Sequence, residues 1–176
     1  GAAFVGSPVF PAGHNHSVAW GATAGLADNA DVFLEEMGPD GRTVRDGEAL
    51  VPCKMRREAI RVKGSQDVVE EVATTHRGPV IGPAPDGGGK AVSLKAVWLD
   101  ARPTKGLLTS HRARSAGEFR AAFERWPSVS LNMVYADTSG DIGWQMVGQV
   151  PRRSRGYGTL PTNGRDAGSP WESEPV

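Results

Sequence analysis

The sequence predicts an α+β fold in which short strands dominate. The 23 glycines and 13 prolines among 176 residues, with only 7% aromatic residues, indicate many turns rather than a helical bundle. Ala59, Ile60 and Val62 are interspersed with charged residues, which is typical of a strand with one wet face, and the clearest of one or two expected helices covers 115–126. The chain is long enough for one domain with a sizeable core or for part of a larger protein.

The first third of the chain predicts two strands followed by a hairpin. Two apolar stretches, SVAWGAT (17–23) and DVFLEE (31–36), flank a segment rich in Gly, Asp and Asn. The following MGPDGRTVRDGEAL contains Pro39-Asp40-Gly41 and Asp46-Gly47, both of which favour chain reversal. We therefore expect strands on both sides of these turns.

The middle of the chain predicts a second hairpin and a further strand. REAIRVKG (57–64) and DVVEEVATT (67–75) are separated by a short polar turn and are expected to pair with one solvated face. KAVSLKAVWLD (90–100) is rich in Val and Leu and is expected to form another strand.

The clearest expected helix is followed by a hairpin and a loop-like tail. Ser115 and Glu118 form a capping box, and Pro127 ends the helix. Its apolar stripe follows the spacing i, i+3, i+4 and i+7 and comprises Phe119, Ala122, Phe123 and Trp126. LNMVYAD and IGWQMVGQV flank the turn TSGD as a hairpin, and residues 151–176 are expected to be loops.

Composition excludes several classes of function. The 20 basic and 20 acidic side chains balance, which removes the electrostatic basis for binding nucleic acid. The arginines at 152, 153 and 155 lack an aromatic stacking platform, so a solvated loop is expected there. No run approaches the ~20 apolar residues of a membrane span. The single Cys53 excludes an intrachain disulfide, and without a partner His it is not expected to be a catalytic thiol.

The stretch GHNHSVAWGATAG (13–25) offers three alternative chemistries. His14 and His16 could bind a metal ion such as zinc, although no third ligand lies near them, and structural histidines are the plainer interpretation. GATAG lacks the residue spacing of a phosphate-binding loop. Its small side chains would, however, let a backbone N–H approach a substrate oxyanion, although small residues more often reflect tight strand packing.

Asp28 and Asp31 lie three residues apart in GLADNADVF. Two carboxylates with an intervening carbonyl suit a hard cation such as calcium. Turn formation and capping are the plainer interpretation of Asp and Asn at these positions on the residues alone, with a cation site as the alternative.

The order of the motifs resembles the β-chain of the penicillin acylase family, which includes penicillin G acylases, cephalosporin acylases and acyl-homoserine lactone acylases. The resemblance covers nearly the whole chain, and GHNHSVAWGATAG and YADTSGDIGW are its most specific parts. It implies that residues 1–176 are a single internal piece of that β-chain and a strand-rich, incomplete portion of an αββα N-terminal nucleophile hydrolase fold. THRGPV (75–80) carries an Arg where the family usually reads THGPV.

The resemblance also implies an activity. A precursor, usually exported, cleaves itself and exposes a Ser whose hydroxyl attacks an amide carbonyl, with its own α-amine (pKa about 8) as the base. Gly1 is not a nucleophile. The resemblance therefore places the Ser upstream of this chain and an oxyanion-binding Asn downstream, so the piece is expected to be inactive by itself.

Site residues follow from the resemblance position by position. Ala24 matches the backbone N–H donor of the oxyanion hole, and Ala22 and Leu131 match the acyl-binding pocket. Asp28, the carbonyl of Ala30, and Asp31 match a structural calcium site. The implied partners are a small N-acyl substrate, the α-chain and the rest of the β-chain, in the periplasm or outside the cell. A non-catalytic β-rich binding module on the same scaffold is the alternative.

Overall fold

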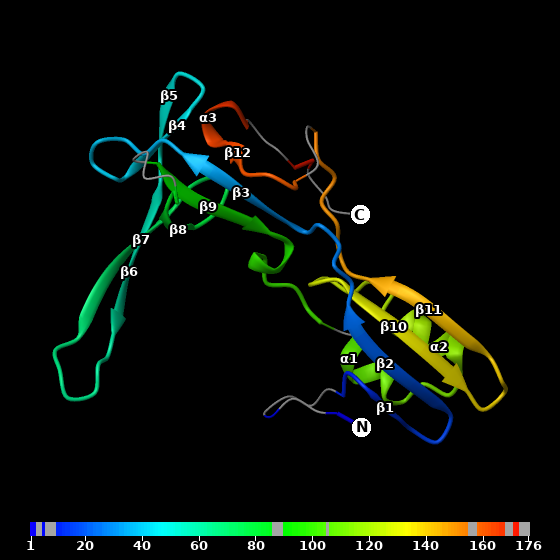
Figure 1. Ribbon diagram of the computed structural model, residues 1–176. Coiled ribbons are helices and arrows are strands. Elements are labelled where there is room, and N and C mark those ends of the chain that lie inside the picture. Colours follow the sequence, from blue (N-terminus) through cyan, green and yellow to red (C-terminus); the bar gives the residue numbers. More distant parts are fainter. Residues whose placement is uncertain are drawn as a thin grey trace. The chain divides into compact units, whose positions relative to one another are not determined.

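The computed structural model describes residues 1–2, 5, 10–85, 90–104, 106–154, 158–167 and 171–172 (Figure 1). The chain divides into two compact units. The first is built from Gly1–Asn29 and Val97–Pro151, and the second from Ala30–Ala96 and Arg152–Glu174. The fold is α+β and strand-rich, as predicted.

The first unit contains a four-stranded antiparallel sheet in the order β1-β2-β10-β11. The strands are β1 (Gly13–His14), β2 (Val18–Ala24), β10 (Leu131–Asp137) and β11 (Ile142–Val147). β10 and β11 form the predicted hairpin around TSGD, where Gly140 has φ +95°. The long-range pairing is between β2 and β10, from Val18 opposite Asp137 to Ala24 opposite Leu131.

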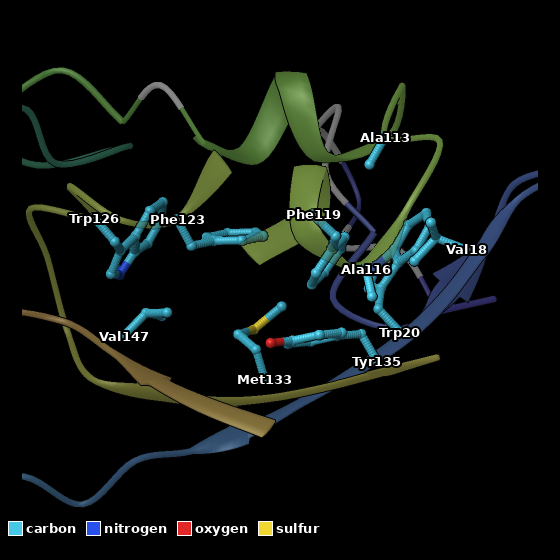
Figure 2. Close-up of a cluster of buried hydrophobic side chains, with 10 residues drawn as sticks. All are labelled: Val18, Trp20, Ala113, Ala116, Phe119, Phe123, Trp126, Met133, Tyr135 and Val147. Atoms are coloured by element: carbon cyan, nitrogen blue, oxygen red, sulfur yellow. The ribbon is translucent and has the colours of Figure 1, made fainter. Parts of the chain in front are cut away.

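Two short helices cover one face of this sheet: α1 (Gly106–Ser110) and α2 (Ala116–Ala122). Figure 2 shows Phe119 and Phe123 pointing from the α2 side toward Met133 and Tyr135 on β10. Phe119 is completely buried and lies 5.5 Å from the Trp20 ring and 5.3 Å from the Tyr135 ring. Burying a side chain of this size contributes roughly 1.5–3 kcal/mol. The predicted apolar stripe supplies the helical side of the core of the first unit.

Helix α2 begins where the sequence predicts but is shorter. The Ser115 Oγ accepts a hydrogen bond from the Glu118 N–H, and the Glu118 carboxylate accepts one from the Arg114 N–H. The regular helix ends at Ala122 rather than at Pro127. The chain continues in tight turns, with the Trp126 N–H donating to the Phe123 carbonyl. These turns carry Phe123 and Trp126 into the core without further helical residues.

The second unit contains a sheet in the order β12-β3-β9-β8 and two separate hairpins. The strands of this sheet are β3 (Ala30–Glu35), β8 (Val80–Pro83), β9 (Ala91–Ala96) and β12 (Thr162–Asn163). The hairpins are β4 (Thr43–Asp46) with β5 (Ala49–Pro52), and β6 (Lys54–Ile60) with β7 (Val68–Thr74). The 3-10 helix η1 (Val97–Leu99), in the first unit, follows β9 within the segment predicted as one strand.

Two sequence predictions for this unit need correction. The β6–β7 hairpin forms (Figure 1), but its residues are largely exposed on both faces instead of one. The tail is not all loop. Thr162 and Asn163 pair in parallel with Phe33 and Leu34 of β3, and α3 (Gly164–Ala167) follows. This parallel pairing is a tertiary contact that a local pattern of two residues cannot reveal.

The core of the second unit contains a buried ion pair. Arg77, the arginine of THRGPV, and Glu35 of β3 both have fully buried side chains, and the Arg77 Nη2 lies 2.7 Å from the Glu35 Oε2. Ser93 Oγ also donates to the Glu35 carboxylate, at 2.6 Å. Burial raises the pKa of Glu35, but the hydrogen bonds from Arg77 and Ser93 and the Arg77 charge outweigh it, so the pKa lies below its ordinary value.

No helix within the described part of the chain is both long enough and apolar enough to cross a bilayer.

Candidate functional site

A cavity of about 460 Å³ lies in the first unit. The sheet contributes residues from the ends of β2 and β10, and the helical layer contributes residues from α1 and from the turns after α2. The lining side chains are almost all apolar: Phe10, Pro11, Ala22, Thr23, Ala24, Leu107, Ser110, Phe123, Trp126, Val129, Leu131 and Met133. Concave apolar sites with few polar groups are typical of small-molecule binding.

Ala22 lies on the wall of this cavity. It is half-buried and shares the helix-facing side of β2 with Val18 and Trp20, because side chains alternate along a strand. Its partner across the sheet is Met133, which also lines the cavity. A methyl group at this position leaves space that a larger side chain would fill.

The backbone N–H of Ala24 is not used by the ladder between β2 and β10. The Gly25 N–H donates to the Ser130 carbonyl at 2.9 Å. Because hydrogen-bonded and non-hydrogen-bonded pairs alternate in an antiparallel ladder, the Ala24 N–H is directed away from β10. β1, on the other side of β2, pairs only with Ala19 and Trp20. The Ala24 N–H therefore lies past the end of the β1–β2 ladder and does not pair with β1.

Leu131 lies directly opposite Ala24 and also lines the cavity. The structure thus brings Ala22, Ala24 and Leu131 together, although they come from segments more than 100 residues apart. Their roles in binding and catalysis stay predictions.

Two polar residues that hold the end of β2 were missed at the sequence level. Asn132 Nδ2 donates to the Ala24 carbonyl at 3.1 Å, and the Asn132 Oδ1 accepts from Trp144 Nε1 at 3.2 Å. Ser130 Oγ accepts from the Ala27 N–H at 3.0 Å. For Asn132, the signal was a polar residue between the apolar Leu131 and Met133.

Gly25, which directly follows Ala24, has a steric reason to be glycine. A Cβ on Gly25 would lie 2.8 Å from the backbone and side chain of Ser130. Any side chain there would push β2 away from Ser130 and displace the neighbouring Ala24.

Neither histidine of the GHNH stretch belongs to a metal cluster. Both His14 and His16 are exposed, and the described ranges contain no group of three or more His, Cys, Asp or Glu side chains able to hold a metal ion. The structural residue is Asn15. Its Oδ1 accepts from the Ser17 and Val18 N–H groups, and its Nδ2 donates to the carbonyls of His111 and Ala113. Asn15 thereby ties the start of β2 to the segment that joins α1 and α2.

The residues matched to calcium fall in different units. Asp28 belongs to the first unit, whereas Ala30 and Asp31 open β3 in the second. Asp31 is buried, and both its carboxylate oxygens accept hydrogen bonds from Arg153 Nε, at 3.1 and 3.0 Å. A carboxylate already bound to a guanidinium does not fit the role of a calcium ligand. Calcium binding itself stays a prediction from the resemblance.

The remaining candidates have structural roles. Burial raises the pKa of Cys53, and the charges of Glu35 and Asp40 raise it further, which is the opposite of what a reactive thiolate needs. In the arginine cluster, Arg152 pairs with Glu172 at 3.7 Å and Arg153 with Asp31, whereas residue 155 lies outside the described ranges.

Comparison with known proteins identifies the family of this chain. A family model described as Penicillin amidase matches residues 1–176. The chain belongs to the penicillin amidase family.

Individual relatives carry two kinds of name. An acyl-homoserine lactone acylase QuiP of Pseudomonas fluorescens is 32% identical over 98% of this chain and 22% of its own length. A penicillin acylase 2 proenzyme of Pseudomonas sp. (strain SE83) is 33% identical over 94% of this chain and 22% of its own length. The solved structure of a thermostable penicillin G acylase from Alcaligenes faecalis matches 97% of this chain and 31% of its own, with a TM-score of 0.83 and 30% identity.

The chain thus spans about a fifth of the length of these curated relatives. The matched structure, at a TM-score of 0.83, shows that the strand-rich arrangement corresponds to part of a penicillin G acylase.

Proposed function

We propose that the full-length protein is an amidohydrolase that cleaves N-acyl amide bonds, and that this chain supplies one wall of its acyl-binding site. The observation that carries this proposal is the apolar cavity on which Ala22, Ala24 and Leu131 lie together. Membership of the penicillin amidase family supports the reaction class, because relatives are named acylases.

In the proposed reaction, a Ser at the amino end of a processed chain attacks the amide carbonyl, and its α-amine accepts the hydroxyl proton. The nucleophile and a second oxyanion donor would come from other parts of the full-length protein. This chain would contribute the Ala24 N–H, which is directed away from β10 and can donate to the developing oxyanion. The acyl-enzyme would then be hydrolysed by water.

The cavity favours an apolar acyl group of limited size. Its volume of about 460 Å³ lies within the usual range of roughly 300–1,000 Å³ for small-molecule sites. The rings of Phe123 and Trp126 lie on its wall and offer an apolar surface. Relatives are named for acyl-homoserine lactones and for penicillins, and both substrate classes carry an acyl group on nitrogen.

Filling the cavity tests this proposal. In the full-length protein, Ala22→Phe should raise the KM for long-chain acyl amides at least about tenfold relative to short-chain ones, because each excluded methylene forfeits about 0.8 kcal/mol. Ala121→Phe, on the exposed side of α2, is the matched control and should leave the chain-length preference unchanged. A wild-type protein that binds acyl amides without cleaving them would instead support the alternative function, a non-catalytic binding module.

We also propose that the protein is made as a precursor and acts in the periplasm or outside the cell. One relative is named a proenzyme, which supports processing. The α-chain and the rest of the β-chain would then be the partners of this segment. Amino-terminal sequencing of the mature protein and cell fractionation test both points. An intact, uncleaved cytoplasmic polypeptide would contradict them.

A further inference from the structure

The buried Asp31 carboxylate in the second unit accepts hydrogen bonds from Arg153 and Trp171. We infer that the Arg153 guanidinium takes the place at Asp31 that the family resemblance assigns to calcium, so that this carboxylate anchors Arg153 and Trp171 without a metal ion. The inference concerns the assembly of the second unit and does not depend on the proposed reaction.

Both oxygens of the Asp31 carboxylate are already engaged. Arg153 Nε lies 3.1 Å from the Oδ1 and 3.0 Å from the Oδ2, and the Arg153 Nη2 lies 3.0 Å from the Oδ1. Trp171 Nε1 also donates to the Oδ2. The side chains of Arg153 and Asp31 are only 10% and 7% exposed. A forked, buried contact of this kind is the geometry that guanidinium, and not a spherical ion, satisfies.

The local charge disfavours a second cation. Lys95 of β9 lies directly opposite Asp31 in the sheet, and its Nζ lies 5.0 Å from the centre of the Trp171 ring. Lys95 therefore places a second positive charge beside Trp171, whose indole N–H donates to Asp31. Calcium requires six to eight oxygen ligands, several of them anionic. Among the residues that the structure describes, no cluster of three acidic, His or Cys side chains offers them.

Gly158 closes the site sterically. Its φ is +73°, a conformation that favours glycine, and a Cβ built on it would collide with the Asp31 carboxylate and the Arg153 guanidinium. The backbone therefore packs directly onto the ion pair. An ion of calcium's size, with coordination distances of about 2.3–2.6 Å, could enter only if Arg153 left.

The ion pair also explains how the tail is held. Arg153 and Trp171 face each other in an isolated antiparallel bridge, and the Glu172 N–H donates to the Arg152 carbonyl at 2.8 Å. The two residues of this bridge, Arg153 and Trp171, thus both reach Asp31 with their side chains. The positive charge that pairs with Asp31 is therefore that of Arg153, a residue of this chain.

Metal content and thermal unfolding of the full-length protein test this inference. We expect wild type and Asp31→Asn to contain equal amounts of calcium by elemental analysis, whatever other sites the protein has. Arg153→Met should lower the Tm by several degrees in EDTA, because it leaves a buried carboxylate unpaired. Arg152→Met, which removes a pair whose side chains are exposed, is the matched control and should shift the Tm by about a degree at most.

Two results would overturn the inference. One is calcium that is stoichiometric in the wild type and lost in Asp31→Asn. The other is an Arg153→Met protein no less stable than Arg152→Met. Should Asp31→Asn fail to accumulate, Arg153→Lys decides: a Tm between those of wild type and Arg153→Met supports the guanidinium anchor, and a Tm equal to that of Arg153→Met but restored by added calcium overturns it.

Discussion

Arg77 forms a buried ion pair with Glu35 in the core of the second unit. Arg77 donates to both oxygens of Glu35 through Nε, at 2.9 and 3.2 Å, and its Nη1 lies 2.7 Å from the His76 Nε2 and 3.3 Å from the Asp46 Oδ1. Arg77 therefore contacts three other side chains at once. The sequence showed the arginine but not the acid with which it pairs, because Glu35 is 42 residues away.

Removing the Arg77 side chain tests how much this pair matters. Arg77→Met should lower the free energy of unfolding by about 3–5 kcal/mol, because Glu35 would be left buried and unpaired. Urea denaturation of the full-length protein measures the change. Arg42→Met removes the exposed pair with Glu71 and should cost about 1 kcal/mol or less. Equal losses in the two variants would contradict a special role for the buried pair.

His76 makes stability depend on pH near neutrality. Burial lowers the pKa of His76, and the Arg77 charge lowers it further. The unfolded chain therefore takes up a proton near pH 6.5 while the folded chain does not, so stability falls as the pH drops from 7 through 6.5 toward the folded pKa. His76→Gln should show a smaller loss between pH 7 and pH 5 in urea denaturation. The same pH profile in both proteins would argue against this assignment.

At the scale of single elements, helix α2 shows how far a local pattern reaches. The capping box correctly located its start, because Ser115 accepts from the Glu118 N–H of the first turn and Glu118 accepts from the Arg114 N–H just before the cap. The end was wrong, because the stripe of apolar residues continues through turns that the core packing stabilises. Seven residues of helix do not stabilise themselves in isolation.

The cap is therefore expected to matter for the first unit. Ser115→Ala should reduce the free energy of unfolding by about 0.5–2 kcal/mol, because the Glu118 N–H loses its partner. Ser115→Asp restores an acceptor at the same position and should recover most of the loss. Chemical denaturation compares the two. If Ser115→Ala matched the wild type, packing rather than capping would define the helix start.

At the scale of the whole molecule, the sheet of the first unit has one covered face and one open face. Val134, Ile142, Trp144 and Met146 lie on the face opposite α2, and Ile142 and Trp144 are 83% and 62% exposed. Contiguous exposed apolar residues of this kind are typical of an interface. Since the chain spans about a fifth of its relatives, we propose that another layer of the full-length protein covers this face.

A charge on this face tests the proposal. Ile142→Asp should lower the Tm and the yield of the full-length protein, because it would bury an unpaired carboxylate beneath the covering layer. Ser139→Asp adds the same charge in the exposed turn TSGD and should be tolerated. Thermal unfolding followed by differential scanning fluorimetry measures both. Equal Tm values for the two variants would show that the face stays in water.

The sequence by itself determined the local features of this protein: the strand segments, the turns, the capping box and the family motifs. These depend on neighbouring residues, whose spacing is visible in the chain. Only the tertiary structure decided that Ala22, Ala24 and Leu131 share one cavity, that Arg77 neutralises Glu35, and that Arg153 binds Asp31. The Asp31 pair joins residues 122 positions apart, and no periodicity reports which distant charges meet once the strands pair.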